Sequence, residues 1–360
     1  MPEPIRVALI GAGFARRVQG PAFRRHPDYK LVGIASARLE SARAAADELG
    51  VKYASDDWKR MLDEVDCDLV SVVTPPKLHH PQARRALELG RDLLLEKPTA
   101  MDAAEAEDLL RFARERGRVH ALNHEYRMMP ARAFARELLR RGDIGPLTRF
   151  EARSHYDFFN PHRGIAWRWL CDAGMGGGMW GAIGSHLVDY AQWVAGPVTS
   201  VSATMENHFP TRPDASGTPR PVTADDAFVV TAEFKDGATG VLEASAVVSH
   251  RDDVFELHGE HGSLFVENDV LFRARPGHPR EQVSVEKEFD IQRHGEDARL
   301  DPFYALLTGL ATSVRDRSGF HPNLEDGVAT QRVLDAARAS HAQGRRVAVE
   351  AGAVGRMGGA

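Results

Sequence analysis

Short apolar runs alternate with amphipathic helical patterns over residues 5–123, and few folds accommodate such an order. The apolar runs, which lack strict polar alternation, cover residues 5–10, 31–36, 68–73, 92–96 and 119–123. Runs of this kind are typical of strands that are buried on both faces of a parallel sheet. Two of the helical patterns end in a glycine, Gly50 and Gly90, as helices often do. The order predicts a doubly wound α/β domain with a parallel sheet.

After residue 125 the pattern changes to one helix followed by long alternating runs. The helical pattern begins at Met129 and ends at Gly142. The alternating runs cover residues 148–159, 199–209, 226–248 and 255–275, and a late helical pattern covers 324–344. Asp236-Gly237 separates two alternating stretches, which is a strong signal for a β-hairpin. We expect an α+β domain with a large open, mainly antiparallel sheet that packs one face on helices, and a long exposed loop over 210–225.

The chain length also indicates two domains. With 360 residues the chain is too long for one compact core of the usual size. We place the domains at residues 1–124 and 125–350, where the pattern changes. The glycine-rich end, residues 351–360, is expected to be a flexible tail.

Charge and cysteine content exclude several classes of protein. The net charge is −5 and no basic block is present, so a nucleic-acid partner is not expected. The two cysteines, Cys67 and Cys171, are far apart and in no metal-ligand spacing, so we expect no metal site and no disulfide framework. A reducing, cytoplasmic location fits this cysteine usage. The first apolar run is too short for a signal peptide, and no window approaches 18 apolar residues, so no membrane contact is expected.

A glycine turn follows the first apolar run, in the sequence VALIGAGFARR. Gly11 and Gly13, with Phe14 and Ala15 beside them, lie between the expected strand and the next helix. Such glycines let the backbone approach a pyrophosphate, which then lies on the helix N-terminus. The third glycine of the G-x-G-x-x-G pattern is replaced by Arg16. The βαβ context favours a dinucleotide site, and the alternative is a plain tight turn.

The end of the second apolar run indicates which dinucleotide binds. An acidic residue there accepts hydrogen bonds from a free ribose 2′-hydroxyl and repels a 2′-phosphate. This chain has Ser36 at that point and Arg38 two residues later. A hydroxyl followed by a guanidinium favours a phosphate, so we expect NADP as cofactor, with NAD as the other possibility. In the alternative interpretation, Arg38 is a solvated residue at the start of the next helix.

Two further motifs follow strands at the edge of the sheet where ligands of α/β folds bind. In TPPKLHH, Thr74 and Pro75 are expected to line the cofactor cleft, and His79 either faces the cofactor or only begins a helix. In LLLEKP, Glu96 and Lys97 lie where a buried strand emerges. An extended lysine there can donate to a carboxamide and to a substrate hydroxyl. The alternative for the pair is a simple ion pair that ends a strand.

The second half of the chain adds the candidates for substrate binding. A glycine-rich turn at residues 176–178 opens a helical segment that carries His186 and Asp189. His186 is expected to face the cleft between the domains, and Asp189 either assists it or bonds backbone in the core. Arg127 is either a substrate contact or an interdomain ion pair. The aromatic and basic segment 154–170 suits sugar binding or an oligomer interface; its candidates are Tyr156, Arg163, Trp167 and Arg168.

Five motifs in this order resemble the glucose–fructose oxidoreductase and inositol dehydrogenase (Gfo/Idh/MocA) family: GAGFAR, TPPKLHH, LLLEKP, GGG…GSHLVD and EDGVATQRVLDAARAS. The resemblance covers about residues 5–349. It implies a Rossmann domain, a second domain with an open sheet that often forms a homodimer or homotetramer, and a small-molecule substrate of the sugar or polyol class. It also implies that Lys97 is the catalytic lysine and His186 the acid/base histidine. The family's aspartate four residues before the histidine is here Ala182, which removes a carboxylate that would lie beside the imidazole.

Three functions are compatible with these motifs. The leading hypothesis is reversible hydride transfer between a substrate CH–OH carbon and NADP, with Lys97 polarising the substrate oxygen and His186 as general base. A second hypothesis is a glycosidase that retains NAD and acts by transient oxidation and elimination. A third is a nucleotide-binding sensor or scaffold without turnover, which the loss of the carboxylate at Ala182 makes worth testing.

Overall fold

The first sheet of the computed structural model, which describes residues 2–295 and 297–350, is a six-stranded parallel sheet. Its strand order is β3-β2-β1-β4-β5-β6. The strands are β1 (Ile5–Ile10), β2 (Tyr29–Ala35), β3 (Tyr53–Ser55), β4 (Leu69–Val72), β5 (Asp92–Leu95) and β6 (His120–Leu122). This is the doubly wound Rossmann arrangement, so the predicted fold class of the first half is confirmed. The tail predicted for 351–360 lies outside the described residues.

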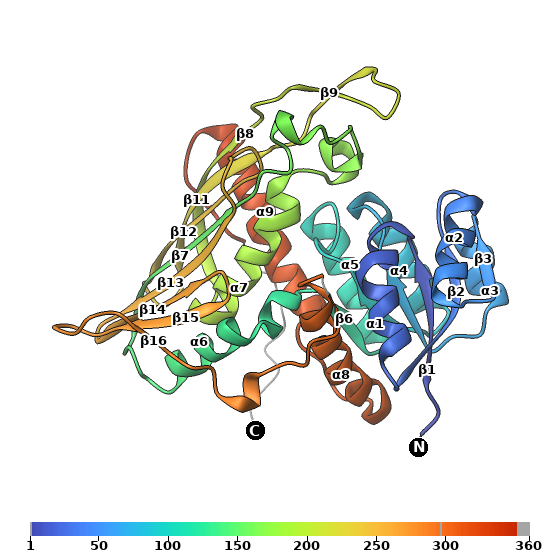
Figure 1. Ribbon diagram of the computed structural model, residues 1–360, viewed down its shortest axis with the longest axis horizontal. Helices are drawn as coiled ribbons and strands as arrows, with labels where there is room; N and C mark the ends of the chain where they lie inside the picture. The colour runs from blue at the N-terminus through green and yellow to red at the C-terminus, as the bar shows by residue number, and fades with distance from the viewer. Residues whose placement is uncertain (1, 296, 351–360) are drawn as a thin grey trace.

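Helices cover both faces of this sheet (Figure 1). They are the π-helical turn η1 (Ala15–Gln19), α1 (Gly20–Arg25), α2 (Leu39–Leu49), α3 (Trp58–Glu64), α4 (His79–Glu88) and α5 (Ala103–Glu115). Alternate residues of β1 pack into different clusters: Val7 and Leu9 contribute to one, Ala8 and Ile10 to the other. Burial on both faces explains why the strands lack polar alternation.

The second sheet has nine strands, in the order β16-β15-β14-β13-β7-β12-β11-β8-β17. The strands are β7 (Leu147–His155), β8 (Val198–Glu206), β11 (Ala227–Phe234), β12 (Thr239–Ser245), β13 (Asp252–Gly259), β14 (Gly262–Glu267), β15 (Val270–Ala274), β16 (Glu281–Gln282) and β17 (Val347–Ala348). Every pairing is antiparallel except that of β7 with β12. The predicted large, mainly antiparallel sheet and the hairpin at Asp236-Gly237 are confirmed.

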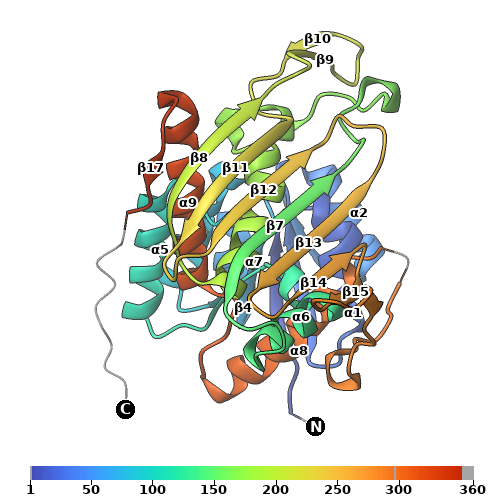
Figure 2. The same cartoon turned by 90° about the vertical axis from the view of Figure 1, so that its left-hand side faces the viewer.

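One face of the large sheet packs on helices. These are α6 (Pro130–Arg140), α7 (Ser185–Ala195), which continues the π-helical turn η7 (Trp180–Gly184), and α9 (Leu324–Gln343). Figure 2 shows the other face of the sheet toward the viewer with the helices behind it. Trp180 and Tyr190 are buried between sheet and helices. In Figure 1, α7 and α9 lie between the two sheets, so residues on them can meet residues from the first sheet.

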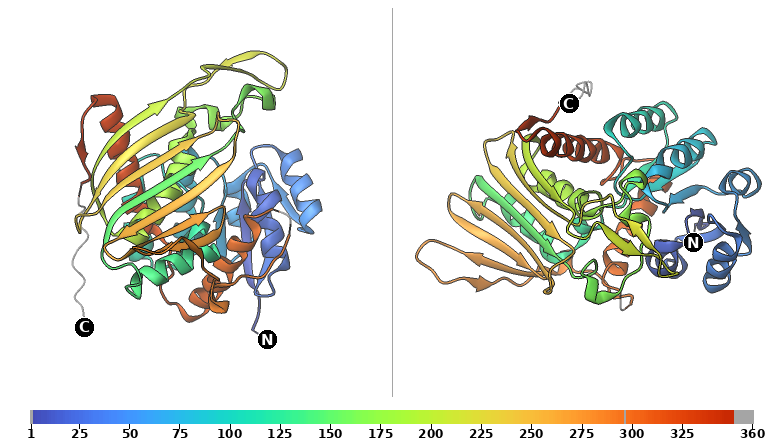
Figure 3. Two further views of the ribbon diagram at one scale, coloured as in Figure 1. Left: turned by 60° about the vertical axis from the view of Figure 1, so that its left-hand side comes forward. Right: turned by 90° about the horizontal axis from the view of Figure 1, so that it is seen from above.

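Besides the short elements β3 and α3, which no sequence pattern marked, two larger parts of the structure differ from the sequence-based expectations. Residues 210–225, predicted as a loop, contain a small hairpin of β9 (Thr211–Pro213) and β10 (Pro219–Pro221). The Asp214 carboxylate holds its turn by accepting from the N–H groups of Ser216 and Thr218. Figures 1 and 3 show this hairpin overhanging the side of the first sheet.

The second difference is a helix that the sequence patterns did not indicate. Helix α8 (Leu300–Asp316) packs Phe303, Leu306 and Leu310 into a core cluster of the first sheet. The division at residue 124 therefore stays a prediction, because a late segment shares the first core. Short helical turns complete the chain: η2 (Pro76–Leu78), η3 (Glu125–Met128), η4 (Pro161–Arg163), η5 (Trp169–Cys171), η6 (Ala173–Met175) and η8 (Lys287–Phe289). Among the residues described, no helix combines the length and apolar character needed to cross a membrane.

Candidate active site

The glycine turn after β1 lies where the first sheet reverses its strand order, the usual nucleotide position in such folds. Gly11 has a φ of +114°, and a Cβ there would collide with the Val73 carbonyl after β4. Gly13 is exposed, and no atom lies within 4 Å of the place where its Cβ would be. Phe14 is half-buried and Ala15 is buried beside it. An open backbone approach beside a helix start fits a dinucleotide pyrophosphate.

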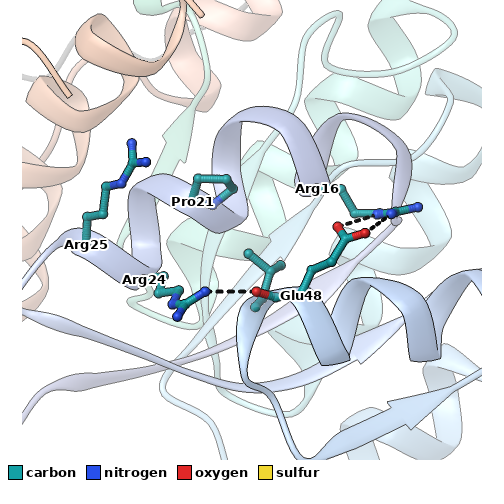
Figure 4. Close-up of a pocket in the computed structure, with 6 residues that line it drawn as sticks. Arg16, Pro21, Arg24, Arg25 and Glu48 are labelled. Carbon is teal, nitrogen blue, oxygen red and sulfur yellow. Dashed lines mark hydrogen bonds and ion pairs between the residues drawn. The ribbon is translucent and has the colours of Figure 1, made fainter. Parts of the chain in front are cut away.

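Arg16, which replaces the third glycine, is directed to α2. Its guanidinium pairs with the Glu48 carboxylate, and Arg24 donates to the Glu48 carbonyl at 2.8 Å. Together with Pro21, these residues line a hollow on the surface next to α1 (Figure 4). The helix start thus carries a cation that already has a partner.

Ser36 and Arg38, the residues from which the cofactor was predicted, lie between β2 and α2. Ser36 is half-buried directly after β2, and its N–H donates to the Ser55 carbonyl at 3.0 Å. Arg38 is exposed and is the N-cap residue of α2. The geometry is compatible with both interpretations of Arg38, the phosphate contact and the solvated helix start.

His79 occupies a buried position between two loops. Its Nδ1 lies 2.9 Å from the Pro98 carbonyl and its Nε2 lies 2.8 Å from the Thr74 carbonyl. Burial lowers the pKa of His79 to about 4, so the ring is neutral at pH 7 and only one of these contacts carries a proton. Thr74 and Pro75 are half-buried, and the Thr74 hydroxyl donates to Gln82 at 2.7 Å. These contacts favour the interpretation of His79 as a helix residue without a ligand.

Glu96 is held by a chain of buried side chains below the cleft. Its Oε1 accepts from the side-chain amides of Gln19 and Asn123, each at 2.7 Å. The Ser71 hydroxyl in turn donates to Gln19 at 2.6 Å. Burial raises the pKa of Glu96. Sequence reasoning missed Gln19 and Asn123, although a polar residue at a buried helix or strand position was a possible signal.

Lys97 reaches from the first sheet to the second domain. Its Nζ donates to the carbonyl of Ala182, in the π-helical turn before α7, at 2.7 Å. Burial lowers the pKa of Lys97, while Glu96 and Glu125 oppose that change. The ammonium from the end of β5 therefore meets the element that carries His186. π-helical turns of this kind are frequent at functional sites.

His186 lies in a stack of rings next to Lys97. Its ring stacks on Tyr126 at 4.0 Å between centroids, and His124 lies edge-on at 5.6 Å. The side chain is 3% exposed, and its buried Nδ1 has no hydrogen-bond partner among residues 2–295 and 297–350. Burial, and next to it Lys97, lowers the pKa of His186 well below its usual value. The imidazole is neutral at pH 7 and able to accept a proton.

Glu125 is a site residue that sequence reasoning missed. It lies on η3, just after β6, and its Oε2 is 3.9 Å from His186 Nε2. The side chain is buried and Oε2 has no hydrogen-bond partner among the described residues. Burial, with Glu96 next, raises the pKa of Glu125 to about 7. The signal was an acidic residue in NHEYR, directly at the carboxyl end of a strand.

Arg127 and Asp189 form a buried, bidentate ion pair. Arg127 Nε donates to Asp189 Oδ2 at 2.8 Å and Nη2 to Oδ1 at 2.5 Å, and Nη2 also reaches Asp326 at 3.0 Å. Burial raises the pKa of Asp189 to about 6, against the effect of Arg127. These contacts favour the interdomain ion pair over substrate binding for Arg127, and a core role for Asp189.

The aromatic and basic segment divides into two groups. The Tyr156 hydroxyl lies 3.4 Å from that of Tyr126, so Tyr156 adjoins the ring stack of His186. Trp167 instead donates its indole N–H to the Pro221 carbonyl of the overhanging hairpin at 2.9 Å. Arg163 is exposed, 3.5 Å from Asp157, and Arg168 is exposed near Phe159.

Arg299, which the sequence reasoning did not select, lies beside Phe14 of the glycine turn. Its guanidinium is 5.1 Å from the centroid of the Phe14 ring and donates to Asp297 at 2.8 Å. The charges of Arg299 and Glu125 affect each other's pKa values. A cation thus stands between the glycine turn and the buried carboxylate.

Comparisons with known proteins extend this geometry. A model of an oxidoreductase family with an NAD-binding Rossmann fold matches residues 5–124, and a GFO/IDH/MocA C-terminal domain model matches residues 133–265. Levoglucosan dehydrogenase of Pseudarthrobacter phenanthrenivorans is 30% identical over 286 residues, 73% of each chain. D-glucoside 3-dehydrogenase of Escherichia coli is 31% identical over 257 residues, 69% of this chain and 72% of that protein. A levoglucosan dehydrogenase structure in complex with NADH and levoglucosan has a TM-score of 0.88 at 25% identity, covering 97% of this chain and all of that one.

Proposed function

The chain belongs to the Gfo/Idh/MocA family of NAD-binding oxidoreductases, and from that premise we propose that it interconverts a hydroxyl and a carbonyl group of a sugar or a related polyol. The observation that carries the proposal is the contact of Lys97 with the helical turn before His186, at the nucleotide end of the first sheet. An ammonium and a neutral imidazole from the two halves of the chain lie around one cleft. The substrates of the two similar dehydrogenases are both carbohydrates.

The roles of the two side chains follow from their chemistry. A bound nicotinamide dinucleotide supplies the acceptor or donor of the hydride. Lys97 Nζ donates a hydrogen bond to the substrate oxygen and stabilises the negative charge that grows there during oxidation. His186 takes the hydroxyl proton as general base, and returns it in the reverse reaction. The lowered pKa of His186 keeps its ring unprotonated at pH 7.

Replacement of Lys97 by methionine tests this assignment. Lys97→Met should reduce turnover by at least about 100-fold while cofactor affinity stays within a few-fold, because the ammonium acts on the substrate oxygen. The measurement is absorbance at the reduced-nicotinamide band with a panel of sugars and polyols, with cofactor titration in parallel. Lys77→Met, at an exposed position on η2, is the control. A fully active Lys97→Met enzyme would remove the mechanism, and cleavage without net cofactor reduction would indicate the glycosidase instead.

We further propose NADP as the preferred cofactor, with Arg38 as the contact to the 2′-phosphate. Support comes from Ser36 in place of an acidic residue after β2, and from an exposed guanidinium at the start of α2. Arg38→Ala should weaken NADP binding about 10-fold and leave NAD binding unchanged, whereas Arg43→Ala, exposed on the same helix, should change neither. Equal or tighter binding of NAD by the unaltered protein would refute the preference.

A further inference from the structure

His186 has no carboxylate on its own helix to stabilise its cation. Position 182, one turn earlier, is alanine, and its carbonyl oxygen already accepts from Lys97. Asp189, one turn later, already accepts hydrogen bonds from Nε and Nη2 of Arg127. An imidazole in a buried site that takes a proton needs an anionic partner, because a buried charge is costly without one. The partner must therefore come from another element.

Glu125 is the carboxylate placed to meet this need. It comes from η3, on the N-terminal side of the cleft, and its Oε2 lies 3.9 Å from His186 Nε2. Both residues are buried, at 3% exposure each. Within the part of the chain that the structure describes, Oε2 has no hydrogen-bond partner, which is uncommon for a buried polar atom. Glu96, the neighbouring buried carboxylate, differs because two side-chain amides already occupy its Oε1.

We propose that Glu125 stabilises the protonated ring of His186 and is the next acceptor of the substrate proton. This inference rests on the proposed function. As the substrate O–H bond breaks, an Nε2–H bond forms on His186, and Glu125 Oε2 accepts a hydrogen bond from it. The Nε2–H bond then breaks as a carboxyl O–H bond forms on Glu125, so the imidazole returns to its neutral state and the charge count is unchanged.

The charges around the pair agree with proton transfer in this direction. Burial raises the pKa of Glu125 to about 7, and burial lowers that of His186 well below its usual value. The carboxylate is thus the stronger base of the two and the stable final position for the proton. The titratable and charged groups that face the pair come from four elements: Glu96 and Lys97 after β5, His124 and Tyr126 around η3, Arg132 on α6, and Arg299 before α8.

Glu125→Gln tests the inference, because the amide keeps the size but cannot take the proton. We expect kcat for sugar oxidation to fall at least about 10-fold, with KM and cofactor affinity within about three-fold. The rise of kcat with pH near neutrality should disappear as well, a result that a purely structural role would not give. Glu137→Gln, whose carboxylate pairs with Arg140 and Arg141 at the surface, should match the unaltered enzyme.

A second-site variant distinguishes the loss of a carboxylate near His186 from a packing defect caused by the substitution. In Glu125→Gln/Ala182→Asp, the new carboxylate lies one helical turn from His186 at a half-buried position, so kcat should recover several-fold and regain a pH-dependent limb. An unchanged pH profile in Glu125→Gln would overturn the inference, as would a joint loss of cofactor binding and activity that Ala182→Asp does not restore. NMR titration of the His186 ring, assigned with His186→Gln, gives an answer even without turnover: removing Glu125 should lower its pKa, and no change would refute the pairing.

Discussion

At the scale of single residues, the two glutamates of the cleft show how environment assigns different tasks to one side-chain type. Glu96 accepts from Gln19 and Asn123 and so has fixed partners. Glu125 has a free Oε2 near His186. Two groups of the same type have different pKa values when their surroundings differ, and such pairs are typical of acid/base sites. The first glutamate orients the strand end that bears Lys97, and the second is available for a proton.

The buried carboxyl of Glu125 should also make stability depend on pH. Its pKa rises from the usual 4.5 to about 7 on folding, so between these values the folded chain holds a proton that the unfolded chain has lost. Stability therefore falls as pH rises through that window and stays lower above it, by on the order of 3 kcal/mol. Glu125→Gln should remove this fall. Urea unfolding from pH 4 to pH 9 measures it; parallel curves for both proteins would contradict the expectation.

Residues of the site differed in how well the sequence could predict them. Lys97 was predicted because it ends a buried strand at the ligand-binding edge, which is a local property. Glu125 was missed because its role depends on an imidazole 61 positions later, and only the fold brings the two together. The sequence patterns also could not specify the partners of Arg127 and His79. Both alternatives for each residue therefore stayed open until the structure showed these contacts.

At the scale of elements, the glycine turn at residues 176–178 explains how the π-helical turn reaches the cleft. Gly176 has a φ of +78°, and a Cβ there would lie 2.6 Å from the Pro76 side chain on η2 and 3.0 Å from Met101. Both neighbours belong to loops of the first sheet. The close approach places η7, and with it the Ala182 carbonyl, against Lys97. Because glycine has no Cβ, the backbone at this position can come so close to these residues.

Gly176→Ala should therefore disturb both stability and activity. The matched control is Gly277→Ala, since Gly277 has a φ of +77° but no atom within 4 Å of its Cβ position. The left-handed backbone costs both variants about 1 kcal/mol, and the collision should cost Gly176→Ala about 2 kcal/mol more. Urea unfolding and kcat are the measurements. Equal losses in the two variants would show that the contact with Pro76 is easily relaxed.

The elements that the sequence predicted were those with a strong local pattern. β1 coincides with the predicted run at 5–10, because all but one of its side chains are buried and none interrupts the run. β3 is three residues long and half exposed, so no apolar run marks it. The hairpin at 211–221 depends on hydrogen bonds of the Asp214 carboxylate within a polar segment. α8 is apolar on the face that packs into the core of the first sheet, but no sequence motif indicated a helix there.

At the scale of the whole molecule, one buried arginine joins three distant segments. Arg127 follows the last strand of the first sheet, Asp189 lies on α7 and Asp326 is in the first turn of α9. Asp326 also completes the cap of α9, because its carboxylate accepts from the Asn323 N–H at 2.9 Å. The ion pair thus fixes α7, and His186 on it, relative to the strand ends that carry the other site residues.

Arg127→Met should leave the Asp189 carboxylate buried without a partner. Breaking a buried pair in this way costs about 3–5 kcal/mol. The loss should grow as pH rises above the usual aspartate pKa near 4, because the folded chain then has to bury a charge or keep a proton that the unfolded chain releases. Arg111→Met, which removes an exposed guanidinium paired with Asp108 and Glu115, should change stability little, because water and salt screen exposed ion pairs. Urea unfolding at pH 5 and pH 8 separates the two cases. If Arg127→Met instead kept full stability and raised KM for the sugar more than ten-fold, Arg127 would be a substrate contact, and the other contacts between the two halves, such as that of Lys97 with Ala182, would have to hold them together.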